Sequence, residues 1–514
     1  MLASSAEIDR LSEAQLREFT TALVKELQSK QALIDRLTHE MAIIKRLRFA
    51  AKSEHFNAQQ KGLFDEDGDA DLEALAQQLE QLASPQTSKV QSQTPKRQTL
   101  PADLPRREVR HEPTQTLCTC GCSLKRIGED IAEKLDYAPG QFTVERHVRG
   151  KWVCARCETL VQAPVPAHVI DKGIPTAGLL AQVLVAKYID HLPLYRQESI
   201  FGRAGLVIPR STMAQWVGCV GVALMPLVQA MQTALLSRQV LHADETPVSM
   251  LSPGTGKTHR AYLWSYCTTA YDPIAAVVFD FADSRAGKHA REFLGFDDER
   301  PELGWRGTLV CDDYSGYKAL FPKGVTEAGC LAHARRKFFD LWANHKSVIA
   351  EQALALFARL YEIEAALKDL DPEERRRCRQ QDSKPAAQAL HQWLTGHRPK
   401  VPDGSATARA IDYSLTRWAA LTRYIDTGDL PADNNRIENL IRPIALGRSN
   451  WLFAGSLRAG KRAAAIMSLL HTARINGHEP HAYLKDVLER LPTHPASRIE
   501  ELLPYHWQPP SLAD

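Results

Sequence analysis

Several features that would place a chain in a particular class are missing from this sequence. It has no run of about 18 apolar residues, so we expect no membrane-spanning helix. Its N-terminus carries acidic residues early and has no apolar signal core, which predicts a cytoplasmic rather than a secreted protein. The net charge is only +3, from 64 basic and 61 acidic residues. This balance neither requires nor excludes a nucleic-acid partner, because a local basic patch can exist within a neutral total.

A phosphate-binding loop is also missing, although residues 251–260 (LSPGTGKTHR) resemble one. Gly256, Lys257 and Thr258 match the end of the motif, but Leu251 occupies a position that requires glycine. Runs of β-branched and aromatic residues flank the segment, so we expect a hairpin turn between two strands. A phosphate-binding loop leads from a strand into a helix. The sequence therefore argues against an ATP site, and we expect Lys257 to face solvent or DNA.

The length of 514 residues is too great for one hydrophobic core and predicts three or four domains. We predict a multidomain α+β protein. The N-terminal third is expected to hold a coiled-coil helix over 1–56, an acidic and then basic flexible linker over 57–113, and a zinc-binding module over 114–165. A helical region resembling a helix-turn-helix follows over 166–235. The remainder is expected to be a ribonuclease-H-like α/β domain over 236–470, with a helical insertion at about 341–430, and a helical tail over 471–514.

The two N-terminal parts follow from periodicity and composition. Apolar residues recur every three or four positions from Leu16 to Ile44, with Thr20 and Lys30 as the polar members of the seam. This pattern is typical of a coiled coil and predicts self-association; the alternative is an amphipathic helix packed on its own chain. The next stretch, FDEDGDADLE, predicts a helix breaker. Residues 84–113 are rich in Ser, Pro, Thr and Gln, as flexible linkers are.

Five of the ten cysteines lie close together, which in a cytosolic chain indicates a metal site rather than disulfides. Cys154 and Cys157 form one half of a zinc knuckle, and Cys118, Cys120 and Cys122 offer the other half. Tetrahedral zinc takes four of these five thiolates, and an all-cysteine site is structural because no coordination position stays open. The basic residues of this module favour a nucleic-acid surface. They are Arg146, His147, Arg149, Lys151 and Arg156.

Residues 175–218 contain three helical segments joined by turns with Pro or Gly. A helix, a short Gly-containing turn and a second helix resemble a DNA-binding helix-turn-helix, with Arg210 as a candidate DNA contact. The alternative is a packed helical hairpin.

Three carboxylates stand on elements that a particular fold would bring together. Three strands, a helix and a fourth strand follow in the order that opens a ribonuclease-H-like fold. In such a sheet the first and fourth strands are neighbours. Asp244 on the first strand and Asp312 at the end of the fourth would then lie side by side, and a later helix supplies Glu438. Two Mg²⁺ or Mn²⁺ ions held by such carboxylates hydrolyse phosphodiesters.

Three neighbouring acids have simpler interpretations. Glu245 follows Asp244 in a strand, so alternation turns it to the opposite face. We expect Asp313 to be a turn residue and Asp433 a helix cap.

Five segments resemble the transposases of the insertion-sequence 66 family: HADETPV, CDDYSGY, CLAHARRKFFD, DNNRIENLIRPIALGRSNWLFAGS and LLHTARINGHEPHAYL. The resemblance also covers the cysteine-rich module and HLPLYRQESIFGRAG. It implies a DDE transposase that binds the ends of its mobile element and cleaves and joins DNA strands, with Asp244, Asp312 and Glu438 in the catalytic positions. It further implies small accessory proteins of the same element and a bacterial host, with binding at the nucleoid. Between Cys118 and Cys122 the spacing departs from the family's regular C-x-x-C knuckle.

Cationic residues near these motifs are candidates for binding the substrate DNA. They are Arg436, Arg442, Arg448, Lys461, Arg462, His333, Arg335 and Arg336. Trp451 and Phe453 either stack near a cleaved end or belong to the core. Two other functions are alternatives: a non-catalytic zinc and helix-turn-helix regulator, which would not cleave DNA, and a ribonuclease-H-like nuclease, which would use water but not a DNA 3′-hydroxyl as nucleophile.

Overall fold

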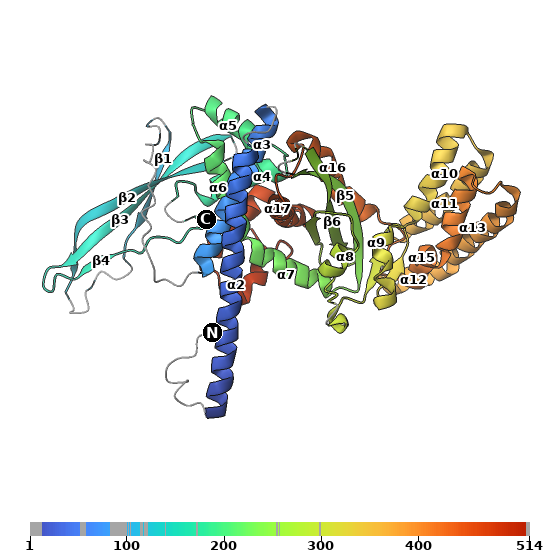
Figure 1. The fold of residues 1–514 in the computed structure, drawn as a ribbon, viewed down its shortest axis with the longest axis horizontal. Helices are drawn as coiled ribbons and strands as arrows, with labels where there is room; N and C mark the ends of the chain where they lie inside the picture. The colour runs from blue at the N-terminus through green and yellow to red at the C-terminus, as the bar shows by residue number, and fades with distance from the viewer. Residues whose placement is uncertain are drawn as a thin grey trace.

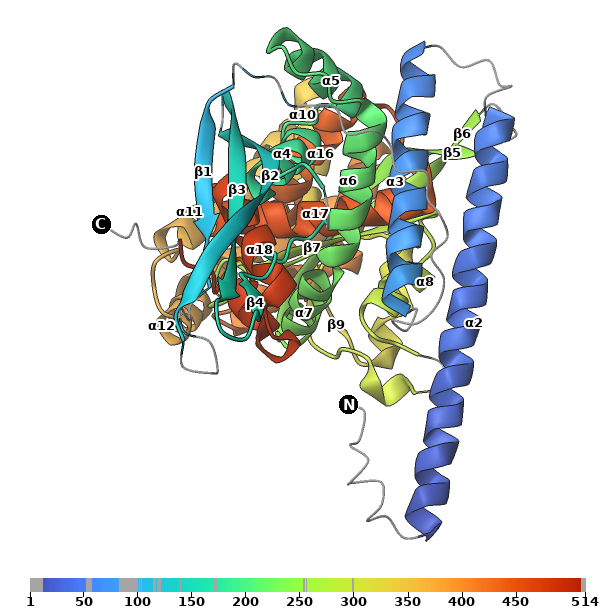
Figure 2. The same ribbon diagram turned by 90° about the vertical axis from the view of Figure 1, so that its left-hand side faces the viewer.

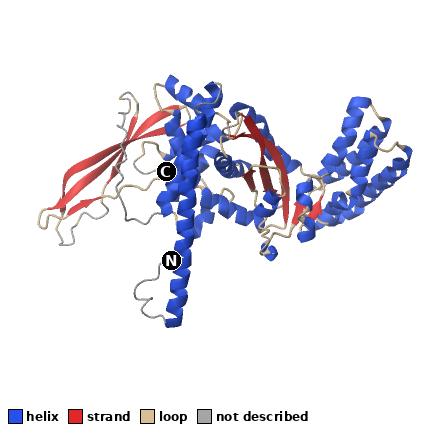
Figure 3. Ribbon diagram, viewed as in Figure 1, coloured by secondary structure: helices blue, strands red, loops and turns tan. Residues whose placement is uncertain are grey.

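The computed structural model describes residues 13–51, 58–82, 100, 102, 104–113, 117, 122–138, 140–170, 173–252, 255, 257–297 and 300–509. The molecule is elongated. A β-sheet arm lies at one end, a central body contains a second sheet, and a bundle of helices forms the other end (Figures 1 and 3). The long N-terminal helix lies alongside the central body and projects beyond it (Figure 2).

The chain begins with two helices, α2 (Glu13–Ala51) and α3 (Ala58–Leu82), which pack side by side (Figure 2). Leu37, in the second half of α2, is buried, whereas Val24 and Leu27 in its first half are exposed. The predicted helix is therefore confirmed. Self-association through its exposed half stays a prediction.

The acidic stretch that we expected to break a helix lies inside α3, and this corrects the predicted linker over 57–113. The acids have partners on the central body. Glu66 accepts hydrogen bonds from the first two backbone N–H groups of the helix that begins at Leu194, at 3.1 and 2.7 Å. Asp71 pairs with Arg462 at 2.8 Å. Burial raises the pKa of Glu66 and Asp71, and the paired cations oppose that shift. Tertiary partners thus make an acidic segment helical.

The β-sheet arm holds four strands: β1 (Arg106–His111), β2 (Leu124–Ala138), β3 (Gln141–Cys154) and β4 (Leu160–Gln162). Their order is β1-β3-β2, and β4 pairs with β3. Strand β1 runs parallel to β3, so its residues belong to this sheet and not to the predicted linker. Phe142, Val144 and Val148 of β3 are buried on one face, and exposed Arg146 interrupts this alternation.

Four helices lead into the central body: α4 (Ala177–Tyr188), α5 (Leu194–Arg203), α6 (Arg210–Ala223) and α7 (Met225–Leu236). Helix α6, the expected recognition helix, is buried from Met213 onward apart from Gln215 and half-buried Ala223. It packs so closely on α3 that a Cβ atom at Gly218 would lie 2.4 Å from the Ala70 carbonyl oxygen. The helical-hairpin alternative is therefore correct, because a recognition helix needs a free face to enter a groove.

No single helix in the described ranges is long and apolar enough to cross a membrane. Helices α6 and α7 together reach the required length and composition, across a bend of 44°.

The central sheet has five strands: β5 (Val240–Ser252), β6 (Lys257–Thr268), β7 (Val277–Ala282), β8 (Thr308–Val310) and β9 (Thr326–Ala328). The order is β7-β6-β5-β8-β9. Strands β7, β6 and β5 are antiparallel neighbours, whereas β5, β8 and β9 are parallel. The first and fourth strands are adjacent, as predicted. The hairpin at 251–260 is confirmed, since Lys257 begins β6 directly after β5.

Helices cover this sheet. Helix α17 (Leu457–Ile475) lies along the edge strand β7, where the Ser468 and Thr472 hydroxyls accept hydrogen bonds from the backbone N–H groups of Phe279 and Val277. These contacts satisfy backbone groups that an open sheet edge would expose. Helix α16 (Asn435–Trp451) packs on β5. Two short helices, α8 (Lys288–Phe293) and α9 (Ser315–Lys318), follow β7 and β8.

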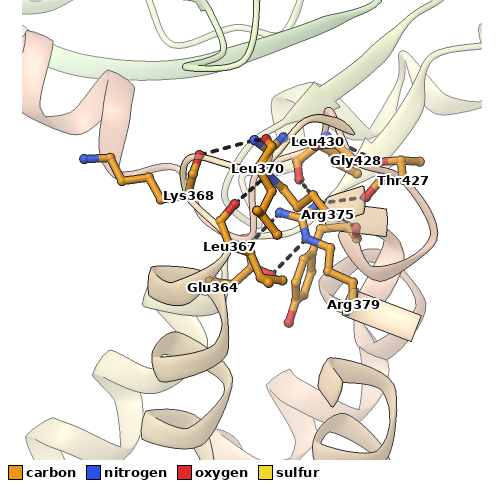
Figure 4. Close-up of polar contacts among 10 residues, drawn as sticks. Glu364, Leu367, Lys368, Leu370, Arg375, Arg379, Thr427, Gly428 and Leu430 are labelled. Atoms are coloured by element: carbon orange, nitrogen blue, oxygen red, sulfur yellow. Dashed lines mark hydrogen bonds and ion pairs between the residues drawn. The ribbon is translucent and has the colours of Figure 1, made fainter. Parts of the chain in front are cut away.

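The helical insertion comprises α10 (Leu331–His345), α11 (Val348–Ala366), α12 (Pro372–Cys378), α13 (Lys384–His397), α14 (Ala406–Thr416) and α15 (Trp418–Thr422). These helices enclose a second hydrophobic core, to which Val310 of β8 and Ala328 of β9 also contribute. Two arginines, Arg375 and Arg379, form the polar contacts at the end of the insertion that is nearer the central sheet, which is called its base below (Figure 4). Arg379 pairs with Glu364 and donates to the carbonyls of Tyr424, Thr427 and Leu430 at 2.7–3.0 Å. The segment that leads from the insertion to α16 is thereby fixed.

The C-terminal residues complete the central body. Helix α17 runs through the predicted domain boundary at 470, and α18 (Pro480–Arg490) packs on α4. Tyr483, Leu484 and Val487 are buried there, so the predicted tail over 471–514 belongs to the main core as far as Trp507. Shorter helical turns lie at Pro301–Leu303, Phe321–Lys323, Arg379–Ser383, Arg398–Lys400, Arg423–Asp426, Leu491–Thr493 and Ala496–Leu502.

Candidate active site

The three predicted carboxylates line two pockets between the central sheet and the insertion that share residues of α10, and the two pockets together are called the cleft. Asp244 is in the first half of β5, Asp312 follows the end of β8, and Glu438 is in the first turn of α16. Asp244 and Glu438 line one part of the cleft together with His333 and Arg336 of α10. Asp312 lines the adjoining part, to which the same His333 and Arg336 contribute. Adjacency of β5 and β8 and the packing of α16 on β5 create this arrangement.

The electrostatics of the cleft favour a cation. Burial, the Glu245 charge and the charges of Asp312 and Glu438 raise the pKa of Asp244 to about 8. The Glu438 Oε1 atom is buried and has no hydrogen-bond partner among the described residues. His333 Nδ1 lies 3.6 Å from it and Arg336 lies 3.8 Å from Oε2, too far for hydrogen bonds. Carboxylates that repel one another and an unsatisfied buried oxygen suit a divalent metal.

A second set of ligand-type atoms includes Glu438. Cys330, His333 and Glu438 have ligand atoms within 4.8 Å of one another. Burial raises the pKa of the Cys330 thiol to about 12, and its sulfur accepts a hydrogen bond from the Asn434 backbone N–H at 3.2 Å. Cys330 thus supports the segment before Glu438. The spacing Cys-x-x-His at the start of a helix is the sequence signal for this set, whereas His333 is predicted above as a DNA contact.

Glu245 has a structural role that alternation did not reveal. It does not line the cleft, as predicted, but its side chain is buried against Arg285 and accepts a hydrogen bond from the Tyr317 hydroxyl at 2.7 Å. Burial raises the pKa of Glu245, and these two hydrogen bonds oppose the shift. Substitution of Glu245 would therefore disturb packing as well as charge.

Asp313 is as expected, whereas Asp433 lies one residue before the N-cap of α16, which is Asn434. Asp313 is an exposed turn residue that pairs with Lys318 and Arg417 at 3.0 and 2.8 Å. Asp433 accepts a hydrogen bond from the Asn435 backbone N–H at 3.0 Å, at the start of α16.

The predicted DNA-binding cations fall into two groups. Arg336 and Arg442 are exposed and line the cleft. Arg335 is half-buried beside Phe339, Lys461 is exposed on α17, and Arg210 is half-buried at the start of α6. The others are engaged by the protein itself.

Among the engaged cations, Arg436 donates to the Thr268 carbonyl at 2.8 Å and Arg448 donates to the Pro247 carbonyl. Arg462 is buried on Asp71, which corrects its assignment to DNA, since a charge without exposure cannot reach a phosphate. Of the two aromatic residues, Phe453 is buried and Trp451 is partly buried against the main core.

The cysteine-rich module is described in part. Cys122 packs against the small cluster of Leu124 and Cys154. The Cys157 sulfur lies 3.1 Å from the Thr159 hydroxyl. Cys118 and Cys120 lie outside the described residues.

Four family models match segments of this chain. The model described as Transposase IS66 family matches residues 172–462. The IS66 C-terminal element matches 468–505, the zinc-finger binding domain of transposase IS66 matches 115–158, and Transposase C of IS166 homeodomain matches 36–109. The chain belongs to the IS66 transposase family, and it contains that family's zinc-finger domain.

Three similar proteins come from Sinorhizobium fredii. Uncharacterized protein y4hP is 36% identical over 460 residues, which cover 84% of this chain and 81% of that protein. Uncharacterized protein y4jD is 34% identical and covers 80% and 81%. Uncharacterized protein y4qI is 33% identical over 530 residues, which span 100% of this chain and 94% of the relative.

Proposed function

We propose that this protein is a DDE transposase that binds the ends of its mobile element and catalyses metal-dependent cleavage and transfer of DNA strands. The single observation that carries the proposal is that Asp244, Asp312 and Glu438, from three separate elements, line two pockets that share His333 and Arg336, and that the charges of Asp312 and Glu438 act on Asp244. Membership of the IS66 transposase family supports it. The strand order β7-β6-β5-β8-β9, with the first and fourth strands adjacent, supports a ribonuclease-H-like catalytic domain.

The carboxylates fit two Mg²⁺ or Mn²⁺ ions. Oxygen ligands, mutual repulsion and the unsatisfied Glu438 Oε1 are the properties that such ions require. When bound, the metal supplies Lewis-acid activation of the attacking oxygen and stabilisation of charge on the leaving oxygen. Arg336 and Arg442, exposed at the same cleft, hold the negatively charged backbone in register. Asp312 is held in place because its Oδ1 accepts the Tyr314 backbone N–H at 2.9 Å.

The test is incubation of the purified protein with DNA of the element's terminal sequence and Mg²⁺, with products resolved on a gel. We expect cleavage and strand joining by the parent. Asp244→Asn, Asp312→Asn and Glu438→Gln should each abolish both and leave DNA binding nearly unchanged, since losing a metal ligand raises the barrier by several kcal/mol, at about tenfold in rate per 1.4 kcal/mol. Asp313→Asn is the matched control.

Three outcomes separate the alternatives. Absence of cleavage by the parent would support a non-catalytic DNA-binding regulator. Cleavage without joining would indicate a nuclease that uses only water. Normal cleavage by Asp244→Asn would show that the catalytic residues have been misassigned.

We further propose that four of Cys118, Cys120, Cys122, Cys154 and Cys157 bind one structural zinc ion. The position of Cys122 beside Cys154 supports this. Metal analysis should find one zinc per chain, lost in Cys154→Ser and kept in Cys378→Ser. Zinc content that does not depend on Cys154 would contradict the proposal.

The exposed first half of α2 supports self-association, and small accessory proteins of the same element are a second class of partner. Removal of residues 1–50 should lower the mass measured by light scattering if α2 joins the chains. An unchanged mass would exclude that role.

A further inference from the structure

Arg285 lies at the edge of the cleft, in the turn between β7 and α8, and two residues hold it in position. Its Nε donates to the Glu245 Oε1 atom at 2.8 Å, and its Nη2 shares the same acceptor. The guanidinium carbon lies 3.8 Å from the centre of the Tyr314 ring, which is stacking distance. The Tyr314 hydroxyl also donates to the Arg285 backbone carbonyl. Both the side chain and the backbone of Arg285 are therefore fixed.

The residue that holds Arg285 is itself rigid. The Glu245 side chain is only 1% exposed, and the buried Tyr317 hydroxyl donates to its second oxygen at 2.7 Å. A buried carboxylate needs a paired cation, so Arg285 compensates the Glu245 charge and Glu245 in turn orients the guanidinium.

One edge of the guanidinium is left for a ligand. No described residue accepts a hydrogen bond from Arg285 Nη1, and the side chain is 43% exposed. Arg285 lines the same part of the cleft as Asp312, His333 and Arg336. Tyr314, which stacks on Arg285, also donates its backbone N–H to Asp312. The turn after β8 thus positions a metal-binding carboxylate and a guanidinium together.

We propose that Arg285 binds a non-bridging phosphate oxygen of the DNA strand at Asp312, and that Glu245 is its positioning residue. The proposal rests on the proposed function, and it adds a substrate contact that lies outside the motifs from which that function was inferred. A planar guanidinium with free N–H groups suits a phosphodiester, and its stacked face keeps the fork aligned. A pair between Arg285 and Glu245 that served stability alone would not need an exposed N–H edge beside Asp312.

The test combines single-phosphate substitutions in the DNA with Arg285→Ala. A set of terminal DNAs, each with one neutral methylphosphonate, is measured for binding to the full-length protein in Ca²⁺, so that cleavage does not interfere. One substitution near the cleavage position should weaken binding to the parent about tenfold, the loss expected for one charge-assisted hydrogen bond. The same substitution should have less than a twofold effect on Arg285→Ala.

Arg359→Ala, which removes an exposed arginine of α11, is the control and should keep the parental pattern. Glu245→Gln should weaken binding in the parent but not in an Arg285→Ala background, because a positioning residue acts only through its partner. Thermal unfolding must show that each variant is folded; Tyr317→Phe provides a milder second perturbation of Glu245.

Two results would overturn the inference: a methylphosphonate pattern identical in the parent and Arg285→Ala, or equal losses for Glu245→Gln with and without Arg285. If the parent itself neither binds nor cleaves the terminal DNA, the proposed function fails instead. The two failures are therefore distinguishable.

Discussion

Arginines at the base of the insertion and arginines at the cleft differ in whether protein atoms accept hydrogen bonds from their N–H groups. Arg379 is fully buried, and three carbonyls and Glu364 accept its hydrogen bonds; Arg375 donates to four carbonyls (Figure 4). Arg285 and Arg336 are 43% and 62% exposed at the cleft. All are equally charged. We infer that donors left without protein acceptors, more than charge or sequence neighbourhood, separate the arginines proposed to bind DNA from the structural ones.

The largest effect on stability should come from Arg379→Lys, which removes hydrogen bonds of a buried arginine. Lysine cannot form the fork to Glu364 and leaves backbone carbonyls unsatisfied, so we expect a loss of about 3–5 kcal/mol in the free energy of unfolding of the insertion. Urea denaturation measures it. Arg359→Lys, in an exposed pair with Glu362, should cost less than about 0.5 kcal/mol. Equal losses for the two variants would show that burial does not make the difference.

Arg462 tests whether the structural class includes an arginine that its sequence context assigned to DNA. Asp71→Ala leaves Arg462 buried without its carboxylate and should destabilise the contact between α3 and the central body by about 3 kcal/mol. Replacing both partners, as Asp71→Leu with Arg462→Met, should recover most of this loss, since no unpaired charge remains. Thermal unfolding measures both. If Arg462→Met weakens DNA binding and leaves stability unchanged, Arg462 contacts DNA and is not a structural arginine.

His471 is a buried basic side chain that stays uncharged, in contrast to the buried arginines, which stay charged and paired. Burial and then the nearby Arg474 charge lower its pKa to about 3. The unfolded chain takes up a proton near pH 6.5 and the folded chain does not, so stability from this group is complete above pH 6.5 and is lost as the pH falls from 6.5 toward 3. At pH 5 the loss should be about 2 kcal/mol relative to pH 8. Denaturation of His471→Leu should lack this contribution, and the same pH dependence in parent and variant would contradict the assignment.

The smallest effect should be at the exposed cleft. Arg442→Ala should leave stability within about 0.5 kcal/mol of the parent and weaken DNA binding nearly uniformly across sequences. The slope of log affinity against log salt concentration should fall by about one, as for one lost phosphate contact. Fluorescence anisotropy at several salt concentrations measures this. An unchanged slope would place Arg442 outside the DNA path.

The strands of the central sheet could be predicted because their cause is local. Residues 240–252 and 257–268 carry β-branched and aromatic side chains in runs separated by Gly and Pro, and the hairpin between them followed from the same pattern. Adjacency of the first and fourth strands then placed Asp244 beside the end of the strand that precedes Asp312. The acids of α3 could not be interpreted in this way. Glu66 and Asp71 are accommodated in this helix because partners on the central body bind them. Those partners lie more than 100 residues away in sequence, so the local pattern does not reveal them.

The sequence by itself determined the first four strands of the central sheet, the cysteine cluster, and the three carboxylates that mark the candidate site, because periodicity, spacing and residue chemistry are properties of neighbours along the chain. Only the tertiary structure decided which charges are free to act. Packing buried Arg462 on Asp71, placed Glu245 under Arg285 and covered α6 with α3. The physical reason is that desolvation and hydrogen-bond satisfaction depend on every group that surrounds a side chain, and those groups come from distant parts of the sequence.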